Sequence, residues 1–148
     1  MRMRSRSSEG ITLDSIIKAL NDMGLDAHTK VSSLGSIVKI EIKYDPLERE
    51  RRALNAYKIS LRSLNQNRDI SGQLIQQIDH FLRRVESTRT EKVLVAAPSQ
   101  EGLKLLLDQV MRIGKEIIDK KREADELRKL IRLFLSYVKE YTRASDNE

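Results

Sequence analysis

Two stretches in the middle of the chain carry cations and amides at helical spacing. The first stretch places four such residues on one helical face, spaced four, three and four residues apart: Arg51, Asn55, Lys58 and Arg62. The second stretch repeats this spacing: Gln73, Gln77, His80 and Arg84. Such faces can follow a phosphate backbone, because Arg and Lys supply charge while Asn and Gln supply neutral hydrogen bonds. The pattern therefore predicts two surfaces that bind a polyanion.

The alternative is that both stripes are ordinary solvated helix surface. Such surfaces usually intersperse acids for ion pairing, as this chain does between Glu116 and Lys129, whereas no acid lies between Arg51 and Arg68. The whole chain has 28 Lys and Arg against 22 Asp and Glu, a net charge of +6. That surplus favours polyanionic partners, meaning DNA, RNA or an acidic membrane surface.

A change of hydrophobic period predicts strands on either side of this region. Val38, Ile40, Ile42 and Tyr44 alternate with polar residues, the preceding segment 27–32 also alternates, and 92–97 is a short β-branched run. Lys39 and Lys43 lie on the polar face of this hairpin and are expected to form a secondary basic rim. Tyr44, at the strand end, is the candidate for stacking on a base. Aromatics make up only 4% of the chain, which favours binding without sequence preference.

Helices are expected between and around these strands. Thr12 and Gly24 bracket a first helix, and Asp45 and Pro46 resemble the cap and first residue of a second one that extends to about Asn65. Another helix is expected over about 70–85, and Pro98 opens a last one. The predicted fold class is α+β: a small antiparallel sheet packed with helices, followed by a long C-terminal helix.

The last helix carries the most regular pattern in the chain. Apolar residues recur at steps of three and four from Leu103 to Tyr141, interrupted only by Lys120. Such a helix would be about 58 Å long, whereas a compact domain of this size is about 40 Å across. We therefore expect this leucine-zipper-like helix to pair with a second copy, in parallel or antiparallel orientation. The residues expected at that homodimer interface are Ile117, Leu127, Ile131, Phe134, Val138 and Tyr141.

These patterns suggest an order of domains along the chain. Residues 1–10 are expected to be a flexible basic arm, 11–100 an α+β nucleic-acid-binding head, 101–143 the dimerisation region and 144–148 a tail.

Nothing in the sequence has the spacing of a catalytic or metal site. The chain has no cysteine, and His28 and His80 lie far apart without neighbouring acids at ligand spacing. We therefore expect no enzyme activity, no cofactor, no metal and no small-molecule substrate. The chain also has no long apolar run, so no membrane partner is expected and a cytoplasmic protein fits best. Its richness in Lys, Arg, Glu, Ile and Leu would suit a thermophile.

The order of elements resembles one known family. Strands over Val38–Tyr44 and Lys92–Ala97, helices from Pro46 and Ile70, and the apolar repeat Leu103–Tyr141 resemble ThermoDBP, a group of archaeal single-stranded-DNA-binding proteins without an OB-fold. The resemblance covers nearly the whole chain, through architecture and without a diagnostic motif. It implies a dimer joined by the zipper, with single strands in a head cleft that has an apolar floor and a basic rim.

The leading hypothesis is sequence-independent binding and protection of single-stranded DNA. The alternatives are a double-stranded-DNA architectural protein and a non-enzymatic scaffold subunit of a larger complex. The preference for DNA or RNA, the site size and the cellular process stay open.

Overall fold

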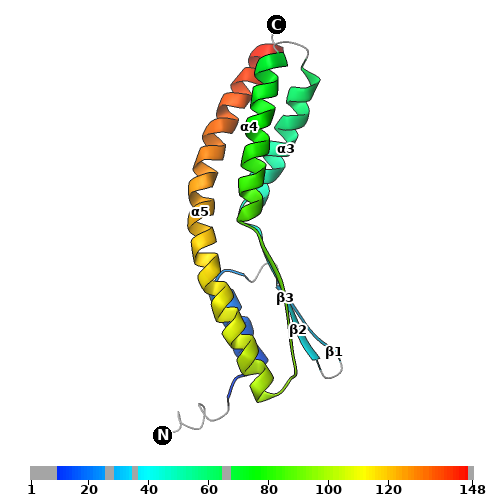
Figure 1. Cartoon of the computed structure of the whole chain (residues 1–148), viewed down its shortest axis with the longest axis vertical. Helices are drawn as coiled ribbons and strands as arrows, with labels where there is room; N and C mark the ends of the chain where they lie inside the picture. Colours follow the sequence, from blue (N-terminus) through cyan, green and yellow to red (C-terminus); the bar gives the residue numbers. More distant parts are fainter. Residues whose placement is uncertain (1–9, 26–28, 35–36, 65–67, 147–148) are drawn as a thin grey trace. The chain divides into compact units, whose positions relative to one another are not determined.

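The chain folds into four helices and three strands within the residues that the structure, a computed structural model, describes: 10–25, 29–34, 37–64 and 68–146. Their order is α2 (Leu13–Asp22), β1 (Thr29–Leu34), β2 (Ile37–Tyr44), α3 (Glu48–Ser63), α4 (Arg68–Ser87), β3 (Thr90–Ala96) and α5 (Gln100–Asp146) (Figure 1). The predicted α+β class is confirmed, with an antiparallel sheet, packed helices and a long C-terminal helix. Most of the predicted basic arm, residues 1–9, lies outside the described residues.

The chain divides into two compact units, each with its own core. Unit 1 comprises residues 1–44 and 90–119, and unit 2 comprises residues 45–89 and 120–148. This division differs from the expected head over 11–100 and helical region over 101–143. The reason is that α5 gives its first half to one core and its second half to the other.

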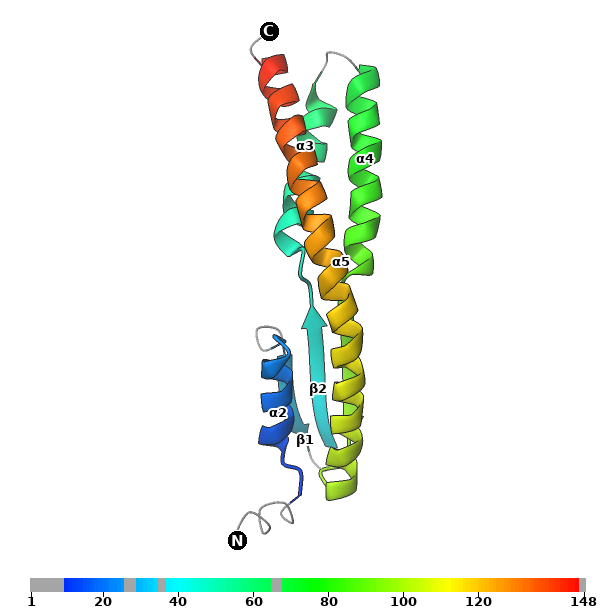
Figure 2. The same cartoon turned by 90° about the vertical axis from the view of Figure 1, so that its left-hand side faces the viewer.

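Unit 1 is a three-stranded antiparallel sheet in the order β1-β2-β3, with helices on one face. Figure 2 shows α2 and the first part of α5 lying against that face. The alternation predicted for β2 is confirmed, because Val38, Ile40 and Ile42 are all buried while Lys39 and Lys43 are exposed. The core beneath the sheet joins these three residues to Leu20 of α2 and Val110 of α5.

The ends of α2 follow the sequence closely. The Thr12 hydroxyl accepts a hydrogen bond from the Ser15 amide at 3.1 Å, and the Ser15 hydroxyl accepts one from the Thr12 amide at 3.1 Å. After the last turn the chain leaves through Gly24, whose φ of 80° is costly for other residues. The expected N-cap and the glycine past the helix end are therefore both confirmed.

Gly114 lies inside the continuous helix α5. A Cβ atom added at this position would come within 2.5 Å of the Met23 sulfur. The glycine therefore allows the end of α2 to approach α5 closely.

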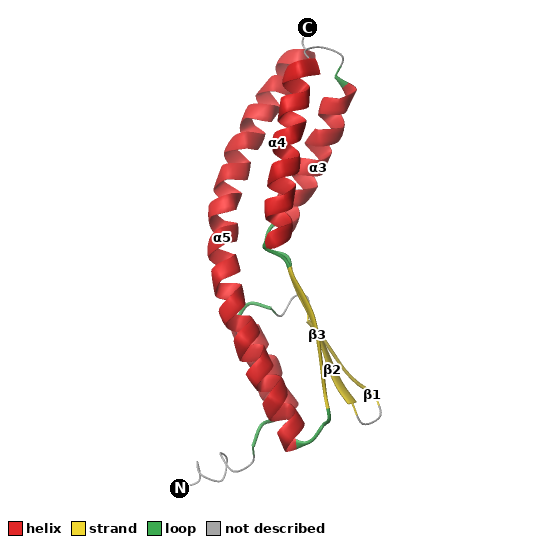
Figure 3. Ribbon diagram, in the orientation of Figure 1, coloured by secondary structure: helices red, strands yellow, loops and turns green. Residues whose placement is uncertain are grey.

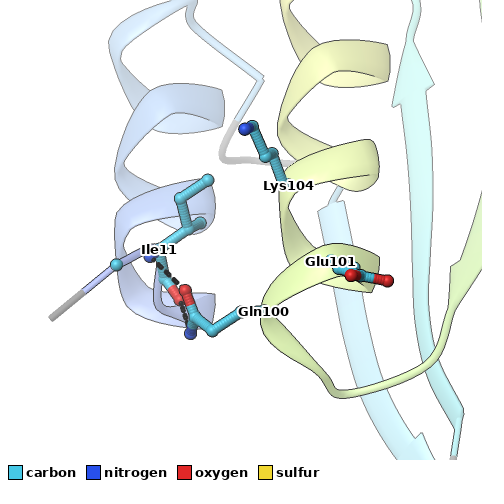
Figure 4. Close-up of a pocket in the computed structure, with 5 residues that line it drawn as sticks. Ile11, Gln100, Glu101 and Lys104 are labelled. Atoms are coloured by element: carbon cyan, nitrogen blue, oxygen red, sulfur yellow. Dashed lines mark hydrogen bonds between the residues drawn. The ribbon is translucent and has the colours of Figure 1, made fainter. Parts of the chain in front are cut away.

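Gln100 holds the segment before α2 against the start of α5. Its side-chain oxygen accepts from the Ile11 amide and its side-chain nitrogen donates to the Ile11 carbonyl, both at 2.9 Å (Figure 4). The residues around this pair line a cavity of about 380 Å³ together with Gly10, Glu101 and Lys104. A side chain at position 10 would collide with Gln100, so Gly10 suits this contact.

We expect Gln100→Ala to lower the free energy of unfolding by about 1 kcal/mol, because two solvent-exposed hydrogen bonds are lost. Urea denaturation measures the loss, and hydrogen exchange at the Ile11 amide reports it locally. Gln100→Glu keeps the acceptor but not the donor, and should fall between wild type and Gln100→Ala. Unchanged exchange at Ile11 in Gln100→Ala would contradict the role given to this pair.

Unit 2 is a bundle of α3, α4 and the later part of α5, which Figure 3 shows side by side. Leu54 of α3, Ile78 of α4 and Leu127 of α5 are fully buried in its core. The start of α3 differs from the prediction. Leu47 occupies the N-cap position without a side-chain hydrogen bond, and Asp45 instead accepts from Arg51 at 2.7 Å.

The apolar repeat of α5 is covered by the same chain, which bears directly on the predicted dimer interface. Four of the six residues expected at that interface are buried here: Ile117 in the core of unit 1, and Leu127, Ile131 and Val138 in the core of unit 2. The other two, Phe134 and Tyr141, are partly buried against the second core. The length argument for a partner therefore does not hold, because the repeat packs on two cores in succession.

The one break in the repeat also has a role within the chain. The ammonium of Lys120 donates to the Arg89 carbonyl at 3.0 Å. The cation at this position thus contacts the segment between α4 and β3 of the same chain.

Candidate nucleic-acid interface

The cationic stripe of α3 is largely neutralised by acids from other parts of unit 2. Arg51 donates to Asp45 at 2.7 Å, and Lys58 donates to Asp79 of α4 at 2.6 Å. Both cations are only about a quarter exposed, at 24% and 22%. The expectation of an acid-free face was wrong, because the carboxylates arrive from outside the segment 51–68.

The rest of that stripe is open to solvent. Asn55 and Arg62 are exposed, and Arg62 forms no ion pair with any residue that the structure describes. Gln66, which would continue the stripe, lies outside the described residues. The α3 face thus offers a polyanion one arginine and one amide.

The second stripe lies on the outer flank of α4. Gln73, Gln77 and His80 are exposed and Arg84 is partly exposed, with Arg83 exposed beside it. Asp79 belongs to the opposite flank, since it faces Lys58 of α3. Neither Arg83 nor Arg84 has an ion-pair partner within the described parts of the chain.

Three contacts show which flank of α5 borders this stripe. The Ser71 and Tyr141 hydroxyls are 3.2 Å apart, the Phe81 and Phe134 ring centroids are 5.2 Å apart, and Ser87 donates to Glu123 at 3.5 Å. Exposed residues of α5 on the side of Glu123, Phe134 and Tyr141 therefore lie next to the outer flank of α4.

An exposed apolar stripe occupies that position on α5. Leu130, Leu133 and Tyr137 are spaced three and four residues apart, and Tyr137 is 59% exposed. Tyr137 comes one turn before Tyr141, which contacts Ser71 of α4. The sequence analysis did not single out Tyr137. The sequence did contain a signal for its exposure: Tyr137 lies outside the apolar repeat of α5, so its ring is not expected to join the core.

Tyr44, the predicted stacking residue, lies on the covered side of the sheet. It is partly buried and packs against the core of unit 1. Lys39 and Lys43 belong to the opposite, uncovered face, as predicted. The structure therefore separates the predicted rim from the predicted stacking residue, and places both in a different unit from Arg62 and Arg84.

Ion pairing within unit 2 leaves a surplus of free cations. Seven of the ten acids with described side chains in this unit lie in ion pairs. Nine cations of the unit have no ion pair among the described residues: Arg49, Arg62, Arg68, Arg83, Arg84, Lys121, Arg122, Lys129 and Lys139. The positive charge of unit 2 is thus concentrated in side chains that are free to meet an anion.

Searches for other kinds of site give two results. Within the described ranges there is no group of three or more His, Cys, Asp or Glu that could hold a metal ion. None of the described helices is long and apolar enough to cross a membrane.

The chain was also compared with known proteins. A scan of protein-family models, a search of curated proteins and a search of solved structures each found no match.

Proposed function

We propose that unit 2 binds single-stranded nucleic acid without sequence preference, and that the chain acts as a binding protein rather than an enzyme. The nine cations without an ion pair among the described residues carry the proposal, because eight of them are exposed and Arg84 is partly exposed, while most of the acids are in ion pairs. The resemblance to ThermoDBP implies the same activity, although for a site in the head rather than on this bundle.

The outer flank of α4 and the adjoining flank of α5 form the proposed binding surface. Arg83 and Arg84 would neutralise phosphates, and the amides of Gln73 and Gln77 would donate neutral hydrogen bonds. Tyr137 would stack on a base from the neighbouring helix, a contact that does not depend on base identity. This arrangement favours unpaired strands, whose bases are free to meet an aromatic ring.

The test is a titration of fluorescent oligonucleotides with Arg83→Gln/Arg84→Gln. We expect affinity at about 0.1 M salt to fall about tenfold or more, and the slope of log K against log salt to lessen by about 1.4, since each phosphate contact on a single strand contributes about 0.7. Tyr137→Ala should weaken binding at least about fivefold, because base stacking is worth about 1–3 kcal/mol.

The matched control is Lys18→Gln/Lys104→Gln, which removes the same charge from exposed positions of unit 1. Its affinity should stay within about twofold of wild type. An equal loss in both variants would mean that net charge, not this surface, drives binding. No binding to any oligonucleotide at about 0.05 M salt would reject the proposal. Stronger binding to duplex than to single strands would favour the architectural alternative.

The second candidate is a scaffold role with a protein partner. The apolar stripe of Leu130, Leu133 and Tyr137 favours it, because an exposed row at helical spacing is typical of a helix-binding surface. The salt dependence of the binding affinity distinguishes the two functions, because an apolar contact lacks the steep salt dependence of phosphate binding.

A further inference from the structure

The free edge of the sheet in unit 1 is the starting point for a second proposal. β3 pairs with β2 on one side only and ends the strand order β1-β2-β3, so its other edge has no strand partner among the described residues (Figure 1). The backbone N–H and C=O groups along such an edge are a template for pairing with another strand. β3 is seven residues long, with a charged pair, Glu91 and Lys92, at one end only.

A groove runs beside this edge. A cavity of about 360 Å³ lies between β3 and α5, and its floor includes Leu94 and Ile113. Its α5 wall continues through Gln109, Arg112 and Glu116, which share one flank of the helix with the exposed Leu105. A strand added at the edge of β3 would cover this groove with its inner side chains.

The uncovered face of the same strand is apolar as well. Val93 and Val95 point away from the helices and are 58% and 54% exposed. β-branched residues this exposed next to a free edge are unusual in a strand that ends a sheet, because edges are normally protected by charge. Both faces of β3 would therefore lose apolar exposure if the sheet continued past it.

We propose that β3 pairs with β3 of a second copy, antiparallel about a two-fold axis at Leu94. This register places Val93 opposite Val95 of the partner subunit, and Leu94 opposite its own copy. The four valines then form one cluster on the uncovered face, and two groove floors meet on the other. A second β3 is a suitable partner because the exposed valines, Val93 and Val95, lie one on each side of Leu94.

Charge on α5 agrees with the same two-fold axis. Lys92, Arg112 and Glu116 line the groove, and Arg112 and Glu116 lie one turn apart, close to Ile113 at its floor. An axis that passes between them brings Arg112 of each subunit toward Glu116 of the other. This pair is therefore compatible with an isologous interface, in which each residue meets its counterpart's partner.

None of the six residues predicted to join two copies takes part in this interface, and of the apolar repeat only Ile113, on the groove floor, borders it. Ile117, Leu127, Ile131 and Val138 keep their places in the two cores. The proposal is also independent of nucleic-acid binding, which uses residues of unit 2.

The test is the mass of the full chain in solution, measured by sedimentation and by light scattering at about 100 µM. We expect a dimer of about 34 kDa, twice the 17.1 kDa of the chain. Val93→Lys/Val95→Lys places four cations in one cluster and should raise the dimer dissociation constant about tenfold or more. Val93→Lys/Val95→Glu places each lysine opposite a glutamate and should restore the dimer.

The controls separate this interface from other surfaces. Both valines are exposed in the single chain, so each variant should keep the urea midpoint of a monomeric fold. Leu133→Lys alters the exposed flank of α5 and should leave the dimer intact. A monomeric wild-type chain, or a dimer that survives Val93→Lys/Val95→Lys, would overturn the proposal. Loss of the dimer in Val93→Lys/Val95→Glu would overturn the register about Leu94.

Discussion

Leu127→Ala is expected to lower the free energy of unfolding of unit 2 by about 3 kcal/mol. Leu127 has no exposed surface and packs in the core of unit 2. Removing its side chain costs the transfer free energy of the lost carbons and leaves a cavity that rigid helices fill poorly. Urea denaturation followed by circular dichroism measures the loss.

The matched control is Leu133→Ala on the same helix, where the leucine is 71% exposed. Its effect should stay within about 0.5 kcal/mol. Protein concentration separates packing within the chain from a zipper between chains, because the stability lost on truncating a residue buried within one chain should be the same at every protein concentration. A Leu127→Ala defect that shrinks as protein concentration rises would contradict burial of this residue within one chain.

Arg128→Met is expected to destabilise unit 2 by about 2–3 kcal/mol. Its guanidinium lies 3.8 Å from the buried carboxylate of Glu50 and donates to the Pro46 carbonyl at 2.9 Å. Breaking a buried pair leaves one charge without compensation, which typically costs more than the pair contributed. We expect a small loss of stability for a broken buried pair, because Arg128 is partly exposed. Arg132, which lies 3.8 Å from Glu50, also remains to compensate part of the carboxylate charge.

A double-mutant cycle with Glu50→Met isolates the free energy of interaction between Arg128 and Glu50. The double variant should be more stable than Arg128→Met alone, because the uncompensated carboxylate is gone. Arg143→Met, which loses an exposed pair with Glu140, should change stability by less than about 0.5 kcal/mol. Strict additivity of Arg128→Met and Glu50→Met would show that the two side chains do not interact.

Local patterns in the sequence were enough to predict the elements of this fold. The alternation of Val38, Ile40 and Ile42 identified β2, and Thr12 and Gly24 located the ends of α2. These signals are encoded within a few residues, so each can be interpreted without knowledge of the rest of the chain.

Predictions that depended on distant neighbours were less successful. The stretch after Arg51 contains no acid, yet Asp45 and Asp79 reach its cations through the fold. Asp45 has the residue type of a helix N-cap, but its carboxylate accepts a hydrogen bond from the Arg51 guanidinium and does not cap the helix. A repeat of apolar residues indicates that a helix face is buried, and does not indicate whether the covering surface belongs to the same chain.

The division of α5 between two cores has a consequence for synthesis on the ribosome. The core of unit 1 needs Ile117 and the core of unit 2 needs Val138, so each core stays incomplete until its own part of α5 has been made. The hairpins β1–β2 and α3–α4 emerge much earlier with their apolar faces uncovered. A nascent chain therefore exposes these apolar faces until α5 has left the ribosome.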